Sequence, residues 1–208
     1  MTNLKGLAPK FGLDCTPEYV AGYKDTHLKP INFDYKLGYL FFLITDTLLD
    51  NYRLLDIGCG TAGYYRLAKN LKELVGLDYS KRMIATANEL NALNKPYKSE
   101  FINSTFDQYN AVKKFDAILD NVSGNYLPHS VVRLKKIAEA LNNNGLCVFH
   151  IQPPAGLKER LGILIKNRAS YKITEKKFLS MVKENGCLTT IFSYKKRDRI
   201  TFFLKKSV

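Results

Sequence analysis

The chain has 208 residues, enough for one well-buried domain and too few for two of ordinary size. Its composition, 46% hydrophobic and 25% charged, is that of a globular protein, and polar residues interrupt the longest apolar stretch, so no membrane span is expected. The N-terminus lacks the pattern of a signal peptide, and the four cysteines are scattered without a paired motif. These features argue against a metal site or a disulfide scaffold and predict a cytoplasmic protein.

The net charge of +13 is concentrated toward the C-terminus. Residues 151–208 carry 14 Lys and Arg against 4 Asp and Glu, whereas residues 1–50 carry 5 against 6. A basic region of this kind can bind RNA, DNA, an acidic substrate or an anionic membrane. The lysines are not interleaved with a pattern of aromatic residues, so a solvated lysine-rich surface is the favoured interpretation.

Residues 1–33 combine prolines, glycines and aromatic residues without a clear period, which is typical of a lid or satellite segment packed on a core. Tyr19 and Tyr23 lie four residues apart and could share one face of a short helix, either to contact substrate or, as we favour, to pack the segment. The main domain is predicted to span residues 34–208 and to begin with a helix over residues 34–50 that lies against a sheet. The apolar positions that support this helix are Leu37, Leu40, Phe41, Ile44 and Leu48.

A short apolar run followed by three glycines comes next. Residues 54–57 predict a buried strand, and Gly58, Gly60 and Gly63 follow in the pattern Gly-x-Gly-x-x-Gly. Apolar residues then return at helical spacing and predict a helix; they are Tyr64, Leu67, Ala68 and Leu71. A strand, a tight turn and a helix in this order indicate a loop that binds a nucleotide cofactor, because glycines let backbone N–H groups approach the ligand. A purely structural glycine-rich turn is the alternative.

The sign of the charge on the residue before the glycines indicates whether the loop binds an anionic or a cationic cofactor. A dinucleotide places its pyrophosphate, an anion, against the N-terminus of the helix that follows such a loop. Asp56 stands two residues before Gly58, where its carboxylate would repel that anion. A carboxylate at this place suits a cofactor that carries an ammonium and a sulfonium group instead.

The second strand is predicted over residues 73–78 and ends in an acid, Asp78. Such an acid can accept hydrogen bonds from the two hydroxyls of a ribose, and bonds to a charged acceptor are the stronger kind. Ser80 follows as a candidate N-cap of a helix that continues to about Leu93. An ordinary acid at a strand end is the alternative, but Asp56 and the glycines stand at the expected distance from Asp78.

The wording Leu-Leu-Asp-Ile-Gly-Cys-Gly-Thr at residues 54–61 resembles the first motif of class I S-adenosylmethionine (SAM)-dependent methyltransferases, and residues 78–83 resemble the second. The resemblance implies a Rossmann-like three-layer sandwich, with helices on both faces of a mostly parallel seven-stranded sheet that ends in a C-terminal antiparallel hairpin. It also implies SAM as cofactor. The residues it assigns to the cofactor here are Asp56, Gly58, Cys59, Gly60, Asp78, Tyr79 and Met83.

The third strand and the loop expected to close over adenine lie in residues 100–109, where the sequence departs from the family pattern. Many relatives have Gly-Asp after this strand, with the Asp bonded to the adenine amino group. The best alignment puts Thr105 at that acid and makes Phe106 an apolar wall for adenine, while Asp107 could do the polar work instead.

The fourth strand is predicted over residues 115–120, and the loop after it should face the cofactor because ligands lie beyond the carboxyl ends of parallel strands. By resemblance to the fourth motif, Asp120 and Asn121 could hold the methionine end. The candidates to face substrate are Ser123, Asn125, Tyr126 and His129. His129 is the candidate general base, although a residue at the start of the next helix is the favoured interpretation.

The C-terminal third is predicted as a turn at residues 142–145, a fifth strand over residues 146–151, a helix from Thr174 to Gly186, and a hairpin of residues 188–194 and 200–204. His150, inside the fifth strand, is expected to be a core histidine.

The function that these features favour is methyl transfer from SAM to an oxygen or nitrogen atom, with a small molecule as acceptor because no appended recognition domain is evident. The alternatives are an RNA or protein methyltransferase that uses the basic region, and a SAM-binding protein without catalysis. Asp56 and the lack of a hydride-transfer constellation disfavour an NAD-type oxidoreductase. An obvious catalytic dyad is not required, because a general base matters only when the attacking atom starts protonated.

Overall fold

The computed structural model describes residues 33–92, 95–120, 131–153, 173–196 and 199–207, together with Pro17 and Val20. The chain forms two compact units, Met1–Asn110 and Ala111–Val208. Their seven strands make a mixed sheet, which confirms the expected mostly parallel sheet with a C-terminal antiparallel hairpin. The boundary expected near residue 33 stays a prediction.

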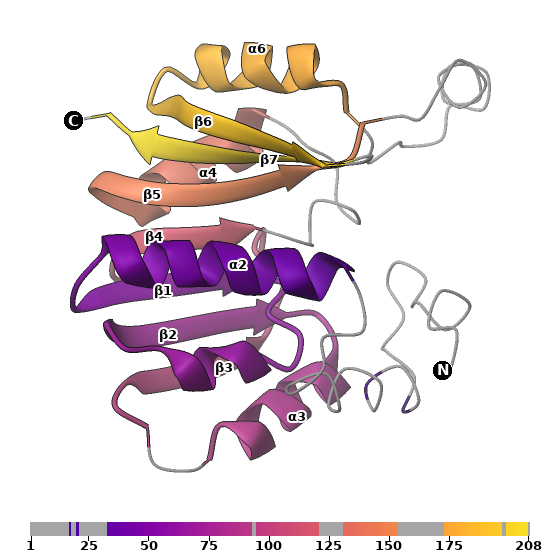
Figure 1. Ribbon diagram of the computed structural model, residues 1–208, viewed down its shortest axis with the longest axis vertical. Helices are drawn as coiled ribbons and strands as arrows, with labels where there is room; N and C mark the ends of the chain where they lie inside the picture. The colour runs from indigo at the N-terminus through magenta and orange to yellow at the C-terminus, as the bar shows by residue number, and fades with distance from the viewer. Residues whose placement is uncertain are drawn as a thin grey trace. The chain divides into compact units, whose positions relative to one another are not determined.

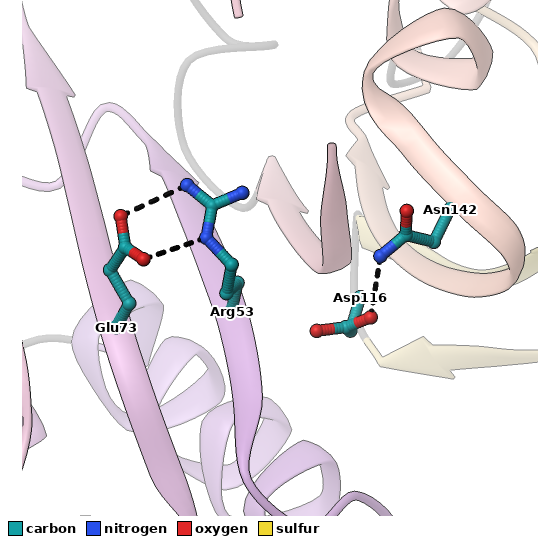
Figure 2. A network of polar contacts seen from close by, with 4 residues as sticks. All are labelled: Arg53, Glu73, Asp116 and Asn142. Atoms are coloured by element: carbon teal, nitrogen blue, oxygen red, sulfur yellow. Dashed lines mark hydrogen bonds and ion pairs between the residues drawn. The ribbon is translucent and has the colours of Figure 1, made fainter. Parts of the chain in front are cut away.

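The first unit contains a parallel sheet in the order β3-β2-β1 (Figure 1). Its elements are α2 (Phe33–Leu48), β1 (Tyr52–Ile57), the 3-10 helix η3 (Gly63–Leu67), β2 (Leu71–Asp78), α3 (Lys81–Leu90) and β3 (Lys98–Asn103). Strands β1 and β2 are buried along nearly their whole length, as continuous apolar runs predict for parallel strands. At their amino ends Arg53 donates to both carboxylate oxygens of Glu73, at 2.7 and 2.9 Å (Figure 2).

The helix expected before the glycine motif is confirmed as α2, but it buries a different face from the one its leucines indicated. Leu40 and Leu48 are 45% and 63% exposed, while Phe41 and Phe42 are at most 2% exposed. Thr45 and Asp46, which interrupt the apolar run in the sequence, are also buried. Burial of these polar groups is tolerated because each has hydrogen-bond partners; the Thr45 hydroxyl donates to the Phe41 carbonyl at 2.9 Å.

Asp46 ties α2 to the beginnings of both β1 and β2. Its carboxylate accepts the Tyr52 hydroxyl at 3.0 Å and the backbone N–H groups of Lys69 and Asn70 at 2.9 and 3.2 Å. Burial and the neighbouring Asp46 raise the pKa of Tyr52 above its usual range, so its hydroxyl keeps the proton that it donates. Three donors on one buried carboxylate make this contact a fixed point of the first unit.

The long helix predicted after the glycine loop is wrong, because only the short η3 forms there. Ala68 is extended, with φ −63° and ψ 135°, and the next two backbone N–H groups turn to Asp46 instead of to the preceding helical turn. Leu71, which the helical spacing had included, already belongs to β2 and is 4% exposed. Leu67 is 56% exposed, so no apolar helix face is built.

The second unit contains four strands in the order β4-β5-β7-β6 (Figure 1). Its elements are β4 (Phe115–Asp120), α4 (Val131–Ala140), β5 (Leu141–Ile151), α6 (Glu175–Asn185), β6 (Leu188–Lys196) and β7 (Arg199–Lys206). Strands β4 and β5 are parallel, and β7 is antiparallel to both of its neighbours. None of the helices in the described part of the chain is long and apolar enough to cross a membrane.

Helix α6 begins and ends where its sequence predicted. The Thr174 hydroxyl caps it by accepting the Lys177 N–H at 3.2 Å, and Gly186 ends it in the left-handed conformation with φ 73°. The helix packs on the sheet through Phe178, whose ring lies 5.0 Å from that of Phe149 and 4.5 Å from that of Phe202. His150 is a buried core residue, with Nδ1 3.3 Å from the Thr201 hydroxyl.

The turn expected at residues 142–145, before the fifth strand, is wrong, because these residues already belong to β5, which begins at Leu141. Phe115 pairs with Leu141 and Ala117 with Leu146, so the register shifts here and residues 142–145 form an irregular stretch opposite Asp116. The Asn142 side-chain amide donates to the Asp116 carboxylate at 2.7 Å and ties this stretch to β4 (Figure 2).

Replacing Asp46 by Asn tests its role as a fixed point. In the variant an amide NH₂ group replaces one of the two carboxylate oxygens, so a donor of the variant faces a donor of the protein and that hydrogen bond is lost. We therefore expect the free energy of unfolding to fall by about 2–3 kcal/mol. Asp50→Asn, at an exposed position just after the same helix, is the matched control and should leave the thermal midpoint unchanged. Equal midpoints for the two variants would contradict the role given to Asp46.

Candidate functional site

The candidate site begins where β1 and β2 end, in the first unit. Asp56 pairs with Gly76 in the β1–β2 ladder, and Asp78 is the last residue of β2. After β1 the chain folds back over β2, because the N–H groups of Gly58 and Cys59 both donate to the Leu77 carbonyl, at 2.8 and 2.9 Å. The loop that follows β1 therefore lies on the carboxyl end of the neighbouring strand.

Two glycines of the motif are required by backbone conformation. Gly58 and Gly60 have φ angles of 78° and 54°, in the region that favours glycine. Apart from its two chain neighbours, no atom of the described residues lies within 4 Å of a Cβ added to Gly60, so the described part of the chain leaves space beside this residue. Gly63 has no positive φ; Ala62 takes the left-handed conformation instead, with φ 50°.

Asp78 fixes the glycine loop against the start of α3. One carboxylate oxygen accepts the Gly60 N–H at 3.0 Å and the other accepts the Ser80 N–H at 2.9 Å. Ser80 is confirmed as the N-cap of α3, because its hydroxyl accepts the Met83 N–H at 3.2 Å.

The loop carries a strongly negative local charge. Asp56 and Asp78 are 2% and 9% exposed, and the Cys59 thiol is buried beside them. Burial, and then the charges of Asp78 and Asp56, raise the pKa of the Cys59 thiol well above its usual value. The thiol is therefore protonated and is no nucleophile, and the site favours a cationic ligand over an anionic one.

Gly76 of β2 lies directly against Cys59 of the glycine loop, and the sequence alone did not identify it as part of the site. A Cβ at this position would lie 2.7 Å from Cδ1 of Phe101 and 2.9 Å from Sγ of Cys59, closer than side chains pack. Only glycine lets β3 and the glycine loop both approach β2 at this point. A glycine in the middle of an apolar strand was the available signal.

Asn103, also missed, joins the end of β3 to the end of β2. Its side-chain amide donates to the carbonyls of Asp78 and Tyr79, at 3.1 and 2.8 Å, and the Ser104 N–H also donates to the Asp78 carbonyl, at 3.1 Å. The Tyr79 side chain is 36% exposed, and Met83 on α3 is buried. These bonds hold the backbone after β2 against the loop after β3.

The loop after β3 places the three adenine candidates differently. The Thr105 hydroxyl donates to the Gln108 side chain at 3.1 Å, while the Thr105 carbonyl accepts the Gln108 N–H at 3.2 Å. Phe106 is 1% exposed, and Asp107 is exposed. Their roles toward adenine stay predictions.

Asp120 in the second unit has a partner that the sequence did not reveal. Its Oδ2 accepts two bonds from Arg133 of α4, from Nε at 3.1 Å and Nη2 at 2.8 Å. The Asp120 side chain is fully buried and that of Arg133 is 3% exposed, so the guanidinium compensates a carboxylate that would otherwise be costly to bury. A role of Asp120 toward a methionine end stays a prediction.

The other candidates lie outside the described residues. They are Tyr19, Tyr23, Asn121, Ser123, Asn125, Tyr126 and His129. The described candidates Asp56, Gly58, Cys59, Gly60 and Asp78 are brought together by the ends of β1 and β2, as their spacing predicted.

Comparisons with known proteins agree with this fold. Residues 48–196 match the methyltransferase domain family. Among solved structures, the N-methyltransferase NodS from Bradyrhizobium japonicum WM9 is 16% identical, with 86% of this chain and 99% of that chain covered and a TM-score of 0.63. The plantazolicin methyltransferase BpumL, crystallised with a pentazolic desmethylPZN analog and SAH, is 15% identical, with 92% of each chain covered and a TM-score of 0.64. No match is found among curated proteins.

The mycolic acid cyclopropane synthase CmaA1, crystallised with SAH and CTAB, is 12% identical over 79% of this chain and 84% of that chain, with a TM-score of 0.64. At these identities the likeness establishes the Rossmann-like fold and no more.

Replacing Gly76 by Ala tests whether β3 and the glycine loop need a glycine at this position of β2. The added methyl group would overlap the Phe101 ring and the Cys59 sulfur, so we expect the free energy of unfolding to fall by about 1–3 kcal/mol. In a Phe101→Ala background both contacting ring atoms, Cδ1 and Cε1, are absent, so the cost of Gly76→Ala should be smaller. Denaturant unfolding of the four variants of this cycle measures both values; the same cost in both backgrounds would contradict the proposed contact.

Proposed function

The chain belongs to the methyltransferase domain family, and from this membership we propose that it transfers a methyl group from S-adenosylmethionine to an oxygen or nitrogen atom of a small molecule. The single observation that supports the cofactor most directly is the pair of buried carboxylates, Asp56 and Asp78, at the ends of adjacent parallel strands, with open space beside Gly60.

The charge of the site fits a sulfonium nucleoside better than a dinucleotide. A pyrophosphate placed against the glycine loop would lie near the buried carboxylates of Asp56 and Asp78, and like charges repel. A ribose diol instead donates to carboxylate oxygens, and a cationic ligand gains from the same field. The open space beside Gly60 leaves room for the ligand to approach the backbone.

Each part of the cofactor is proposed to contact a different set of residues. Asp78, which the Gly60 and Ser80 N–H groups hold in place, accepts the ribose hydroxyls, and Asp56 contributes negative charge. Tyr79, Met83 and Phe106 provide apolar contacts to the nucleoside. The residues that complete the set are Gly58, Cys59 and Gly60 of the loop, Thr105 or Asp107 for the adenine amino group, and Asp120 and Asn121 for the methionine end.

The reaction itself asks mainly for positioning. The bound cofactor supplies a methyl group activated by its positive sulfur, which departs neutral when a lone pair of the acceptor attacks in line. Holding the acceptor at that angle and excluding water can provide several kcal/mol of the acceleration. A base is needed only if the attacking atom starts protonated, and His129 is the proposed candidate. The proposed substrate contacts are Tyr19, Tyr23, Ser123 and Tyr126.

A small-molecule acceptor is supported by the sequence after β4. Methylators of adenine or amide nitrogen have Asn/Asp-Pro-Pro-Tyr/Phe there, whereas this chain has Asp-Asn-Val-Ser at residues 120–123. RNA or protein is the second candidate acceptor, favoured by the excess of 14 basic over 4 acidic residues in residues 151–208.

Cofactor binding is tested by calorimetry with SAM and NAD on the same protein. We expect SAM to bind and NAD not to bind. Gly60→Ala should weaken SAM at least about tenfold, because a methyl group then occupies the space beside the loop and the backbone conformation is strained.

Gly186→Ala is the matched control for this experiment. Gly186 also has a positive φ, 73°, and a Cβ added to it would meet no non-neighbouring atom of the described residues within 4 Å, so the strain is comparable. The control should lose a similar amount of thermal stability and keep SAM affinity. Failure of SAM to bind the unmodified protein would overturn the proposed function.

The acceptor class is tested by transfer of a labelled methyl group from SAM to pools of small molecules, RNA and proteins. We expect label in the small-molecule pool. Label in the RNA pool, together with RNA affinity that falls steeply with salt, would establish the second candidate. Binding of SAM without transfer to any pool would indicate a SAM-binding protein without catalysis.

A further inference from the structure

Strand β6 exposes an unusually apolar edge in the second unit. It pairs with β7 on one side and is the outermost strand in the described part of that unit's sheet (Figure 1). Every residue from Thr189 to Lys195 is exposed, on both faces of the strand. Ile191, Phe192 and Tyr194 are 54%, 47% and 40% exposed. An apolar strand edge with open backbone groups is a template for another strand.

The outer half of β6 is regular enough to accept such a strand. The β6–β7 register shifts between Thr190 and Phe192, and from Phe192 to Lys196 each residue pairs in order with Phe203 to Arg199. The Phe192 ring stacks on that of Phe203, with centroids 4.2 Å apart and planes 14° apart, which holds β6 firmly on β7. The shift at Ile191 limits the regular edge to these five residues, which suits a short segment better than a long strand.

Charge indicates which segment fits this edge. The sequences of β6 and β7 contain Lys195, Lys196, Arg199, Lys205 and Lys206 and no acidic residue. We propose that the outer edge of β6 docks an extended acidic segment of a partner protein, with alternating apolar and acidic side chains, as an added strand. Backbone hydrogen bonds would hold the segment, its apolar side chains would cover Phe192 and Tyr194, and its acids would approach the basic end of the hairpin.

Two other occupants fit less well. A second copy of the chain would bring together two regions that each hold 14 basic and 4 acidic residues, so the pairing would be repulsive. RNA could stack on the exposed rings, but it does not form the ladder of backbone hydrogen bonds that an added strand forms with the outer edge of β6. The inference is independent of the proposed methyl transfer.

The test uses a fluorescein-labelled peptide of alternating valine and glutamate, measured by fluorescence anisotropy. We expect saturable binding that weakens as salt is raised, and no binding of the same peptide with lysine for glutamate. Alternate N–H groups of an extended peptide point to opposite edges, so two N-methylated peptides are made, one with the odd and one with the even backbone nitrogens methylated. The version whose methyl groups lie on the edge that pairs with β6 should not bind.

Lys195→Glu should lower the affinity of the protein for the valine–glutamate peptide at least about threefold, because the charge near the docked acids is reversed. Lys177→Glu, on the exposed side of α6, changes the net charge equally and should leave the affinity unchanged. The thermal midpoint of Lys195→Glu should equal that of the parent protein, whereas Lys177→Glu should keep or slightly raise it, because Glu at this position can form a capping box with Thr174. The proposal would be overturned if the glutamate and lysine peptides bound equally well, or if the two variants bound the glutamate peptide with equal affinity. It would also be overturned if a uridine oligonucleotide bound in preference to the peptide, or if the protein formed a dimer that Lys195→Glu dissociates.

Discussion

The carboxylate of Asp78 holds the candidate site together. It accepts the N–H groups of Gly60 and Ser80, so one side chain at the end of β2 fixes both the glycine loop and the start of α3. Asn103 then fixes the backbone after Asp78 from the side of β3. Three segments that are distant in the sequence thus share one anchored point, and a ligand bound there would meet a preformed loop.

Buried carboxylates have the same structural use elsewhere in the chain. Asp46 anchors the starts of β1 and β2 to α2, and Asp120 binds Arg133 at the end of β4. Each is buried and each is compensated by donors, which is the condition under which a buried charge can be tolerated. The chain therefore uses buried acids as anchors, in helix α2 at Asp46 and at the end of β4 at Asp120. At Asp56 and Asp78 buried acids are also the source of the negative charge at the candidate site.

That field connects structure with chemistry. Together with burial, which is the larger cause, it raises the pKa of the Cys59 thiol. The same field would repel a pyrophosphate and stabilise a sulfonium nucleoside. Gly76 contributes by letting Phe101 and Cys59 approach the backbone of β2, which brings the loop close to the carboxylates. The positive charge of the β6–β7 hairpin belongs to the second unit and supports a different kind of ligand.

The sequence by itself determined the strand order along the chain, the cap of α3, the limits of α6 and the joining of the glycine motif with Asp78, because glycine spacing, capping residues and apolar runs act locally. Only the tertiary structure decided that the segment after the loop is the short η3 and that α2 buries Thr45 and Asp46. It also decided the Asp120–Arg133 pair and the need for glycine at residue 76. The physical reason is that the hydrogen-bond partners of a buried polar group come from segments remote in the sequence, and the space beside a glycine is limited by a neighbouring strand. Local periodicity in the sequence shows neither the remote partners nor the neighbouring strand.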